Sequence, residues 1–155
     1  MAALGALSWV VLTAGASGPS DRDALVADEA PGYAVEDFNY PGADKILEDQ
    51  GIVLKRGDGH ITLADCASET DLLEVSARRN ADNICFRVVG DSGWLTLEVP
   101  AVYLIKGNSY DTQVDMTVGT EKKSFDIDKN AWTAVGETAD EQGREHMLVE
   151  IRTSK

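Results

Sequence analysis

The chain has 155 residues, and its 27 acidic against 14 basic side chains give a formal net charge of −13 at pH 7. A chain of this length suits one domain with a single hydrophobic core. The negative surface repels phosphate backbones and anionic lipid headgroups, so we expect neither nucleic acid nor a membrane as a partner. A basic protein partner or a basic substrate fits this charge, although the same acidic balance also serves solubility.

Residues 1–16 predict a secretory signal peptide. The stretch MAALGALSWVVLTAGA is apolar from Ala2 to Val11 and ends in small residues. An apolar run followed by small residues at A-x-A spacing is typical of a cleaved signal, and the run is shorter than the roughly 20 residues that span a bilayer. We therefore expect a secreted, extracellular protein. The alternative is a buried N-terminal helix or strand.

Residues 17–44 predict an extended arm. This stretch holds three of the four prolines and shows neither helical nor strand periodicity. It also carries apolar side chains that linkers usually lack, namely Tyr33, Val35, Phe38 and Tyr40. An extended segment with such anchors can add a strand to a partner's sheet or lie in its groove. We predict that these four residues bind a protein partner; the alternative is an arm that packs on its own domain or stays free.

Residues 45–155 predict a β-domain. A short helix over residues 44–51 comes first, with Asp44 as its cap and Gly51 at its end. Short β-rich runs then alternate with turns of Gly, Asn, Asp and Ser. The expected strands cover residues 52–56, 60–64, 72–79, 84–89, 94–99, 102–106, 112–118, 124–128, 131–135 and 146–152.

The spacing of these runs predicts the fold class. About nine or ten strands at intervals of roughly 8–12 residues are typical of an all-β protein, here a single small antiparallel β-sandwich or barrel. The first two strands are predicted to form a hairpin around Gly57-Asp58-Gly59. The most polar loop covers residues 138–145.

Two cysteines, Cys66 and Cys85, are predicted to form a structural disulfide. Their even number and the expected export favour oxidation. The bridge would close a loop of about 20 residues and stabilise the fold by roughly 3 kcal/mol in the chain-entropy model. The pair has neither the C-x-x-C spacing of a redox dithiol nor the clustered histidines or acids of a zinc site.

The tetrapeptide GDSG at residues 90–93 surrounds the nucleophile in trypsin-like proteases. A serine nucleophile needs a base, an orienting acid and an oxyanion hole. His60 precedes Ser92 by too short a stretch for the protease scaffold, and His146 follows it in the wrong order for that family. Trp94 also stands where the family has a glycine. Because Gly, Asp and Ser are ordinary turn residues, we interpret the motif as a turn between two strands.

The other polar motifs also favour structural interpretations. The tripeptide Arg56-Gly57-Asp58 suits a hairpin turn. The outward acids Asp111, Asp115, Asp126 and Asp128 are expected to be solvated, since no calcium-binding loop surrounds them. Neither histidine has metal-ligand spacing. We therefore predict no catalytic residues, no metal site and no cofactor.

The tryptophans of the β-domain are predicted to differ in role. We place Trp132 in the core, whereas Trp94 could serve either as a core anchor or as part of a binding face. A carbohydrate-binding module that stacks sugars on Trp94 or Tyr103 is therefore one alternative function. A protease inhibitor whose arm occupies a cleft is another.

The runs YPGADKILEDQGIVLKRGDGHITLADC and KNAWTAVGETADEQGREHMLVEIRTS resemble small secreted proteins of Streptomyces-like actinobacteria. Together with the signal, the aromatic arm and the small disulfide-bonded domain, they resemble the adaptor subunit of umbrella toxin particles. The resemblance implies a non-enzymatic adaptor that links a lectin-like subunit to a large repeat-containing toxin chain. It also implies that residues 33–40 lie in the arm that enters the cleft of the lectin-like subunit.

Overall fold

The computed structural model describes residues 38–155. The predicted signal peptide and most of the predicted arm, including Tyr33 and Val35, lie outside these residues. Within them the chain forms eleven strands in two antiparallel sheets, one α-helix and one short 3-10 helix. The predicted all-β fold is confirmed, and the two sheets make it a sandwich.

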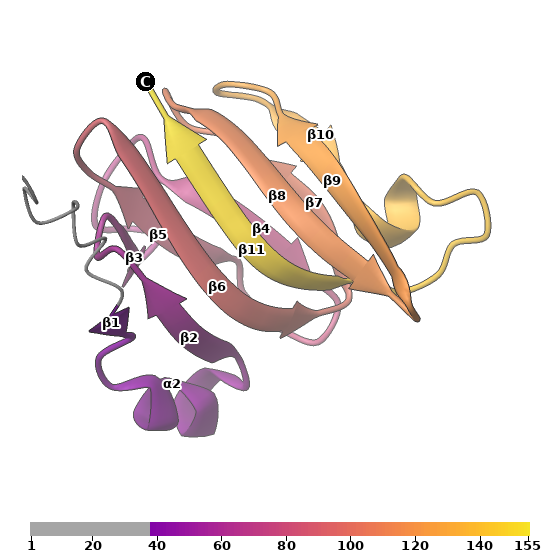
Figure 1. The fold of residues 1–155 in the computed structure, drawn as a ribbon, viewed down its shortest axis with the longest axis horizontal. Helices are drawn as coiled ribbons and strands as arrows, with labels where there is room; N and C mark the ends of the chain where they lie inside the picture. Colours follow the sequence, from indigo (N-terminus) through magenta and orange to yellow (C-terminus); the bar gives the residue numbers. More distant parts are fainter. Residues whose placement is uncertain (1–37) are drawn as a thin grey trace, which may run out of the picture. The chain divides into compact units, whose positions relative to one another are not determined.

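The first sheet, sheet A, has six strands, and the second, sheet B, has five. In spatial order, sheet A consists of β1 (Phe38–Asn39), β2 (Val53–Gly57), β6 (Ser92–Pro100), β11 (Met147–Ser154), β8 (Asp111–Val118) and β9 (Glu121–Ile127). Sheet B consists of β10 (Trp132–Ala134), β7 (Val102–Lys106), β4 (Leu73–Ala77), β5 (Ile84–Val88) and β3 (Ile61–Ala64). The helices are α2 (Ala43–Gln50) and η1 (Gly136–Thr138). Figure 1 shows sheet A in front of sheet B.

The core lies between the two sheets because strand residues point alternately to opposite faces. In β6, Leu95, Leu97 and Val99 are buried, whereas the residues between them are only partly covered. Val114 and Met116 of β8 are buried in the same way, as their alternation predicted. Each fully buried side chain of this size stabilises the fold by about 1.5–3 kcal/mol.

The predicted hairpin over residues 52–64 is wrong. β2 pairs with β1 and β6 in sheet A, whereas β3 pairs with β5 in sheet B. The connection therefore crosses from one layer to the other. Gly57 is needed there because a Cβ atom would lie 2.8 Å from the carbonyl oxygen of Trp94, and Gly59 turns the chain with a φ of 81°.

The predicted helix is confirmed as α2, but its cap differs from the expectation. Gly51 ends the helix in the left-handed conformation, and its N–H donates to the carbonyl of Leu47 at 2.9 Å. The N-cap residue is Gly42 rather than Asp44, and no side chain caps the helix. Asp44 lies in the first turn, where the helix dipole favours a carboxylate.

The start of the domain lies within the predicted arm. Phe38 and Asn39 form β1, which pairs with Gly57 and Arg56 of β2. Tyr40 then packs against the core. The sandwich thus begins before residue 45, because these residues complete the edge of sheet A.

The predicted disulfide joins Cys66 to Cys85, with their Cα atoms 5.2 Å apart. Cys85 lies in β5, and Cys66 follows β3, whose Ala64 is the register partner of Cys85. The bridge therefore fixes the loop after β3 to the neighbouring strand of sheet B.

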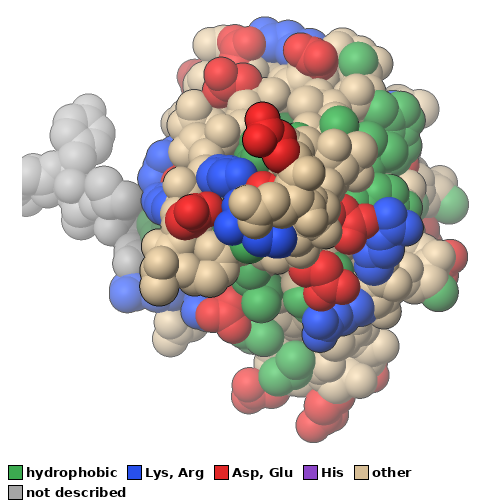
Figure 2. All heavy atoms as spheres, turned by 90° about the vertical axis from the view of Figure 1, so that its right-hand side faces the viewer, with side chains coloured by type: hydrophobic (Ala, Val, Ile, Leu, Met, Phe, Trp, Pro, Cys, Tyr) green, Lys and Arg blue, Asp and Glu red, His purple; other side chains and the backbone are tan. Residues whose placement is uncertain are grey.

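The polar loop at residues 138–145 is held by a buried carboxylate. The side chain of Asp140 is only 3% exposed and accepts hydrogen bonds from Arg144 and Lys123. The hydrogen bonds from Arg144, followed by that from Lys123, hold the pKa of Asp140 well below its ordinary range. Acidic and basic side chains are interspersed on this side of the domain (Figure 2).

Candidate binding groove

The GDSG motif belongs partly to a strand. Ser92 and Gly93 open β6, so only Gly90 and Asp91 remain in the turn that crosses from sheet B to sheet A. Gly93 is required for close packing, since a Cβ atom would lie 2.9 Å from Cγ1 of Ile61 and 3.0 Å from Cβ of His60. A packing requirement therefore accounts for the second glycine of the motif.

The fold brings a histidine, a carboxylate and this serine together. The Nδ1 atom of His60 donates to the backbone carbonyl of Ser92 at 2.6 Å and lies 3.4 Å from the carboxylate of Asp58. Within residues 38–155, no hydrogen bond joins the Ser92 hydroxyl to His60. A catalytic triad needs the imidazole to accept the serine proton. The observed contacts instead tie the start of β6 to the connection between β2 and β3.

The Arg56-Gly57-Asp58 tripeptide lies at the end of β2 and not in the predicted hairpin turn. Gly57 is buried. The carboxylate of Asp58 accepts from the backbone N–H of Trp94 at 3.2 Å and of His60 at 3.0 Å. These bonds hold the aspartate against the domain, so the tripeptide is not displayed on a projecting loop.

An open groove of about 670 Å³ crosses the outer face of sheet A. Its central feature is a row of register partners on four neighbouring strands: Trp94 of β6, Arg152 of β11, Gln113 of β8 and Asp126 of β9. All four line the groove. A second row of Ser92, Ser154 and Asp111 lies beside it. The groove is also lined by Asp58, Gly93, Thr112, Ile127, Glu150 and Thr153.

The charge of Arg152 is neutralised by carboxylates of its own sheet. Its guanidinium pairs with Glu150 and lies 3.7 Å from the carboxylate of Asp115. At the other end of the row, the side-chain amide of Gln113 donates to Asp126 at 2.9 Å. The groove therefore offers an aromatic ring at one end and a carboxylate at the other.

Asp115 is buried, contrary to the prediction that it is solvated. It is 3% exposed and bonds to Lys122 and Ser124 of β9. Burial raises its pKa, but these hydrogen bonds and the charges of Lys122 and Arg152 outweigh burial, so its pKa lies below the ordinary value. Asp111, Asp126 and Asp128 are exposed, as expected.

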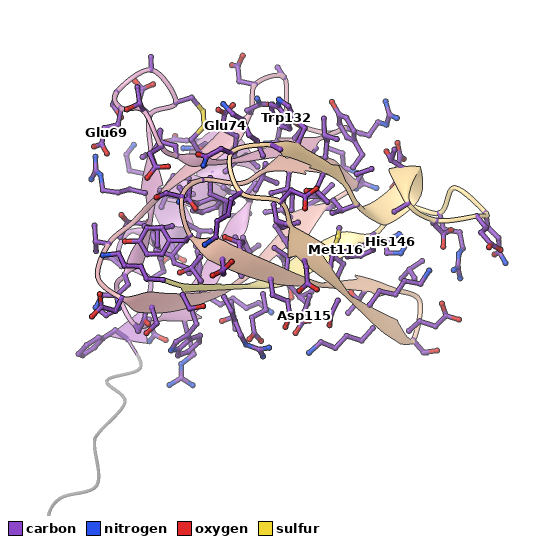
Figure 3. All side chains as sticks on the ribbon, turned by 90° about the horizontal axis from the view of Figure 1, so that it is seen from above. Glu69, Glu74, Asp115, Met116, Trp132 and His146 are labelled. Carbon is purple, nitrogen blue, oxygen red and sulfur yellow. A yellow bond between two sulfur atoms is a disulfide. The ribbon has the colours of Figure 1, made fainter. Side chains whose placement is uncertain are left out.

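The prediction that Trp132 lies in the core is wrong. The side chain is 44% exposed because β10 is the edge strand of sheet B and pairs Trp132 with the outward-facing Lys106. The ammonium of Lys106 lies 5.9 Å from the centre of the ring and 2.8 Å from the carboxylate of Glu74. Figure 3 shows Trp132 and Glu74 on the opposite side of the domain from Asp115.

The two predicted sugar-stacking rings are placed differently. Trp94 is half-buried on the outer face of sheet A, where it lines the groove. Tyr103 is also half-buried, but the guanidinium of Arg78 lies 4.6 Å from its ring centre. Trp94 is therefore the better placed of the two to meet a ligand.

The described arm residues fall into two classes. Phe38 is 57% exposed, whereas Tyr40 is partly buried against the core of its own domain. The phenol of Tyr40 accepts a hydrogen bond from the backbone N–H of Leu63 at 2.6 Å. Of the two, Phe38 alone presents most of its side chain to solvent.

The two histidines serve structural contacts. His146 is buried, and its Nδ1 donates to the carbonyl of Arg144 at 2.7 Å. His60 is half-exposed and directly precedes β3. No group of three or more His, Cys, Asp or Glu side chains within residues 38–155 has the geometry of a metal site.

Comparisons with protein-family models and with curated proteins identify no relative. No protein-family model matches the chain, and no curated protein gives a significant match.

Within residues 38–155, no helix is long and apolar enough to cross a membrane.

Sequence reasoning missed Arg152, Gln113 and Glu150 as members of a site. The alternation of residues 112–118 indicated that Gln113 points outward. The sequence carries no local signal that β11, the last strand, lies between β6 and β8. The row therefore became visible only with the sheet order.

Proposed function

We propose that the protein is a secreted, non-enzymatic adaptor that binds another protein subunit through its N-terminal segment. The observation that carries this proposal is the exposed ring of Phe38, at the point where this segment joins the sandwich. Exposed large apolar side chains are usual features of protein-binding surfaces.

The residues after Phe38 support a fixed starting point for such a segment. The backbone N–H of Tyr40 donates to the carbonyl of Lys55 at 2.8 Å, and its phenol binds the N–H of Leu63. Holding the root of a binding segment lowers the entropy that is lost on docking.

Strand β1 also supports docking by backbone pairing. It contains two residues and lies at the edge of sheet A, with β2 as its neighbour. An edge strand offers unpaired backbone groups to which an extended segment can bond. A partner could therefore contact both the Phe38 ring and the edge of the sheet.

Other features are compatible with this proposal. The Cys66–Cys85 disulfide fits an oxidising, extracellular compartment. The described residues also lack an activated serine. On the basis of the resemblance to umbrella toxin adaptors, we propose a lectin-like subunit and a large repeat-containing toxin chain as the partners.

Affinity purification of the tagged full chain from culture supernatant tests the proposal. We expect a secreted protein to co-purify with the unaltered chain and to be lost when Tyr33, Val35 and Phe38 are all replaced by serine. The matched control is Leu47→Ser, which removes an exposed apolar side chain of similar exposure, 45%, from α2. Retention of the partner by the triple variant would overturn the proposal.

A further inference from the structure

We propose that the groove on sheet A binds lysine or arginine side chains of an extended basic segment of a protein partner. The described residues that line this groove all follow residue 57 in the chain, and the inference does not depend on the function proposed above. Three observations support it: the charges in the groove, the lack of a cation from residues 38–155 on the Trp94 ring, and the length of the central row.

The charge of the groove favours a cationic occupant. Four carboxylates line it, those of Asp58, Asp111, Asp126 and Glu150, against the single guanidinium of Arg152. Asp111 is paired with Lys129 at 3.0 Å, so Asp58 and Asp126 are the lining carboxylates that have no lysine or arginine partner within residues 38–155. Arg152 is turned toward Glu150 and Asp115, as described above. Asp126 accepts a hydrogen bond from Gln113, and no cation within residues 38–155 forms an ion pair with it. The net charge of −13 would also attract a basic partner from a distance.

Trp94 differs from Trp132 and Tyr103, two other rings of the domain that are exposed or half-buried. Tyr103 and Trp132 each have a cation of the same chain near the ring, provided by Arg78 and Lys106 at 4.6 and 5.9 Å from the ring centre. No cation within residues 38–155 occupies this position on Trp94. Indole is the best aromatic partner for a cation, so the vacant ring beside acidic groups suits a cation brought by a partner.

The carboxylate of Asp58 lies at the same end of the groove as the Trp94 ring. The carboxylate of Asp58 accepts the N–H of Trp94 at 3.2 Å, so an acid lies beside the strand that carries the ring. A lysine or arginine over the indole would therefore also meet a negative charge. Burial of the contact in the groove strengthens such a pair relative to an exposed one.

The width of the row sets the spacing of the basic residues. Trp94 and Asp126 lie on strands three neighbours apart, and neighbouring strands are about 4.8 Å apart, so the two ends are separated by roughly 14 Å. An extended chain rises about 3.3 Å per residue, so roughly four residues cover this distance. The occupant is therefore an extended segment with basic side chains four positions apart. Gln113, between Arg152 and Asp126 in the row, can form a hydrogen bond with the backbone of the segment.

Calorimetric titration of the full chain with an acetylated, amidated Lys-Gly-Ser-Gly-Lys peptide tests this inference. We expect binding that weakens as salt rises, because the contact is electrostatic. Trp94→Ala should weaken it roughly threefold to tenfold, in line with a desolvated cation–π contact. Asp126→Asn should weaken it to a similar or smaller extent.

Matched variants and ligands make the result decisive. Trp132→Ala and Asp128→Asn, which alter an exposed tryptophan and an exposed aspartate outside the groove, should leave the affinity unchanged. Far-UV circular dichroism checks that each variant is folded. If Trp94→Ala does not fold, NMR spectra of the unaltered protein replace it, and the indole N–H signal of Trp94 should shift when the lysine peptide is added. The inference is overturned by equal losses in the control variants, by equal binding of a Gln-Gly-Ser-Gly-Gln peptide, by no detectable binding, or by binding of a neutral oligosaccharide in place of the basic peptide.

Discussion

The phenol oxygen of Tyr40 accepts a hydrogen bond from the backbone N–H of Leu63 at 2.6 Å. This bond joins the residue that follows β1 of sheet A to β3 of sheet B. Tyr40 therefore fastens the start of the described chain to both layers of the sandwich. The exposed Phe38, two residues earlier, is held close to a rigid scaffold.

Removal of this phenol should destabilise the domain. Tyr40→Phe leaves a partly buried N–H without its partner, at a cost of about 1–2 kcal/mol in the free energy of unfolding. Urea unfolding followed by circular dichroism measures the change. The control is Tyr103→Phe, because Tyr103 is also half-buried but forms no hydrogen bond through its phenol with residues 38–155. Equal effects of the two substitutions would contradict the assigned role.

Reduction of the Cys66–Cys85 bridge should lower stability by roughly 3 kcal/mol, because the unfolded chain regains the entropy of the closed loop. Urea unfolding with and without a reducing agent measures this difference. The Cys66→Ala, Cys85→Ala double variant serves as the control, since the reducing agent should not change its midpoint. An unaltered midpoint for the native protein would show that the bridge contributes little.

The Asp140 carboxylate should make stability depend on pH. Its pKa is depressed in the folded state, so its contribution is complete above the ordinary value of 3.8 and is lost as the pH falls through and below that value. Asp140→Asn should therefore be less stable than the native protein at pH 7, and the gap should narrow at pH 3. Thermal unfolding at both pH values measures the gap. Asp128→Asn, at an exposed position, should show no such gap, and a gap for Asp140→Asn that is equal at both pH values contradicts the assignment.

The last two residues of the GDSG motif, Ser92 and Gly93, should respond differently to substitution. Gly93→Ala places a methyl group against Ile61 and His60, so we expect a loss of about 1–3 kcal/mol in unfolding free energy. Ser92→Ala changes an exposed side chain and should shift stability by less than about 0.5 kcal/mol. Chemical denaturation of both variants tests the structural interpretation, and a larger loss for Ser92→Ala would refute it.

The sequence predicts local features of the fold well. The inward positions of Val114 and Met116 follow from strict alternation, and Gly51 ends α2 because glycine tolerates the left-handed conformation. The pairing of distant strands has no local signal. The stretch around Gly57 was therefore predicted as a hairpin turn, although it carries the chain between the two sheets.

The candidate site was less predictable because exposure depends on neighbours that are distant in sequence. Asp115 is covered by Lys122 and Arg152 from the two adjoining strands, and Trp132 is exposed because its strand lies at an edge. Trp94 could be named from the sequence, but its partners in the groove depend on the position of β11. Composition and periodicity do not contain this information.

The most direct measurement of the adaptor proposal compares two exposed apolar side chains in the full chain. Once a partner has been co-purified, its dissociation constant can be measured by biolayer interferometry for the unaltered chain, Phe38→Ser and Leu47→Ser. Removal of an aromatic anchor from an interface commonly costs more than 1 kcal/mol, which corresponds to a loss of roughly fivefold or more in affinity. The account predicts this loss for Phe38→Ser and unchanged binding for Leu47→Ser. Equal affinities for all three proteins would contradict it.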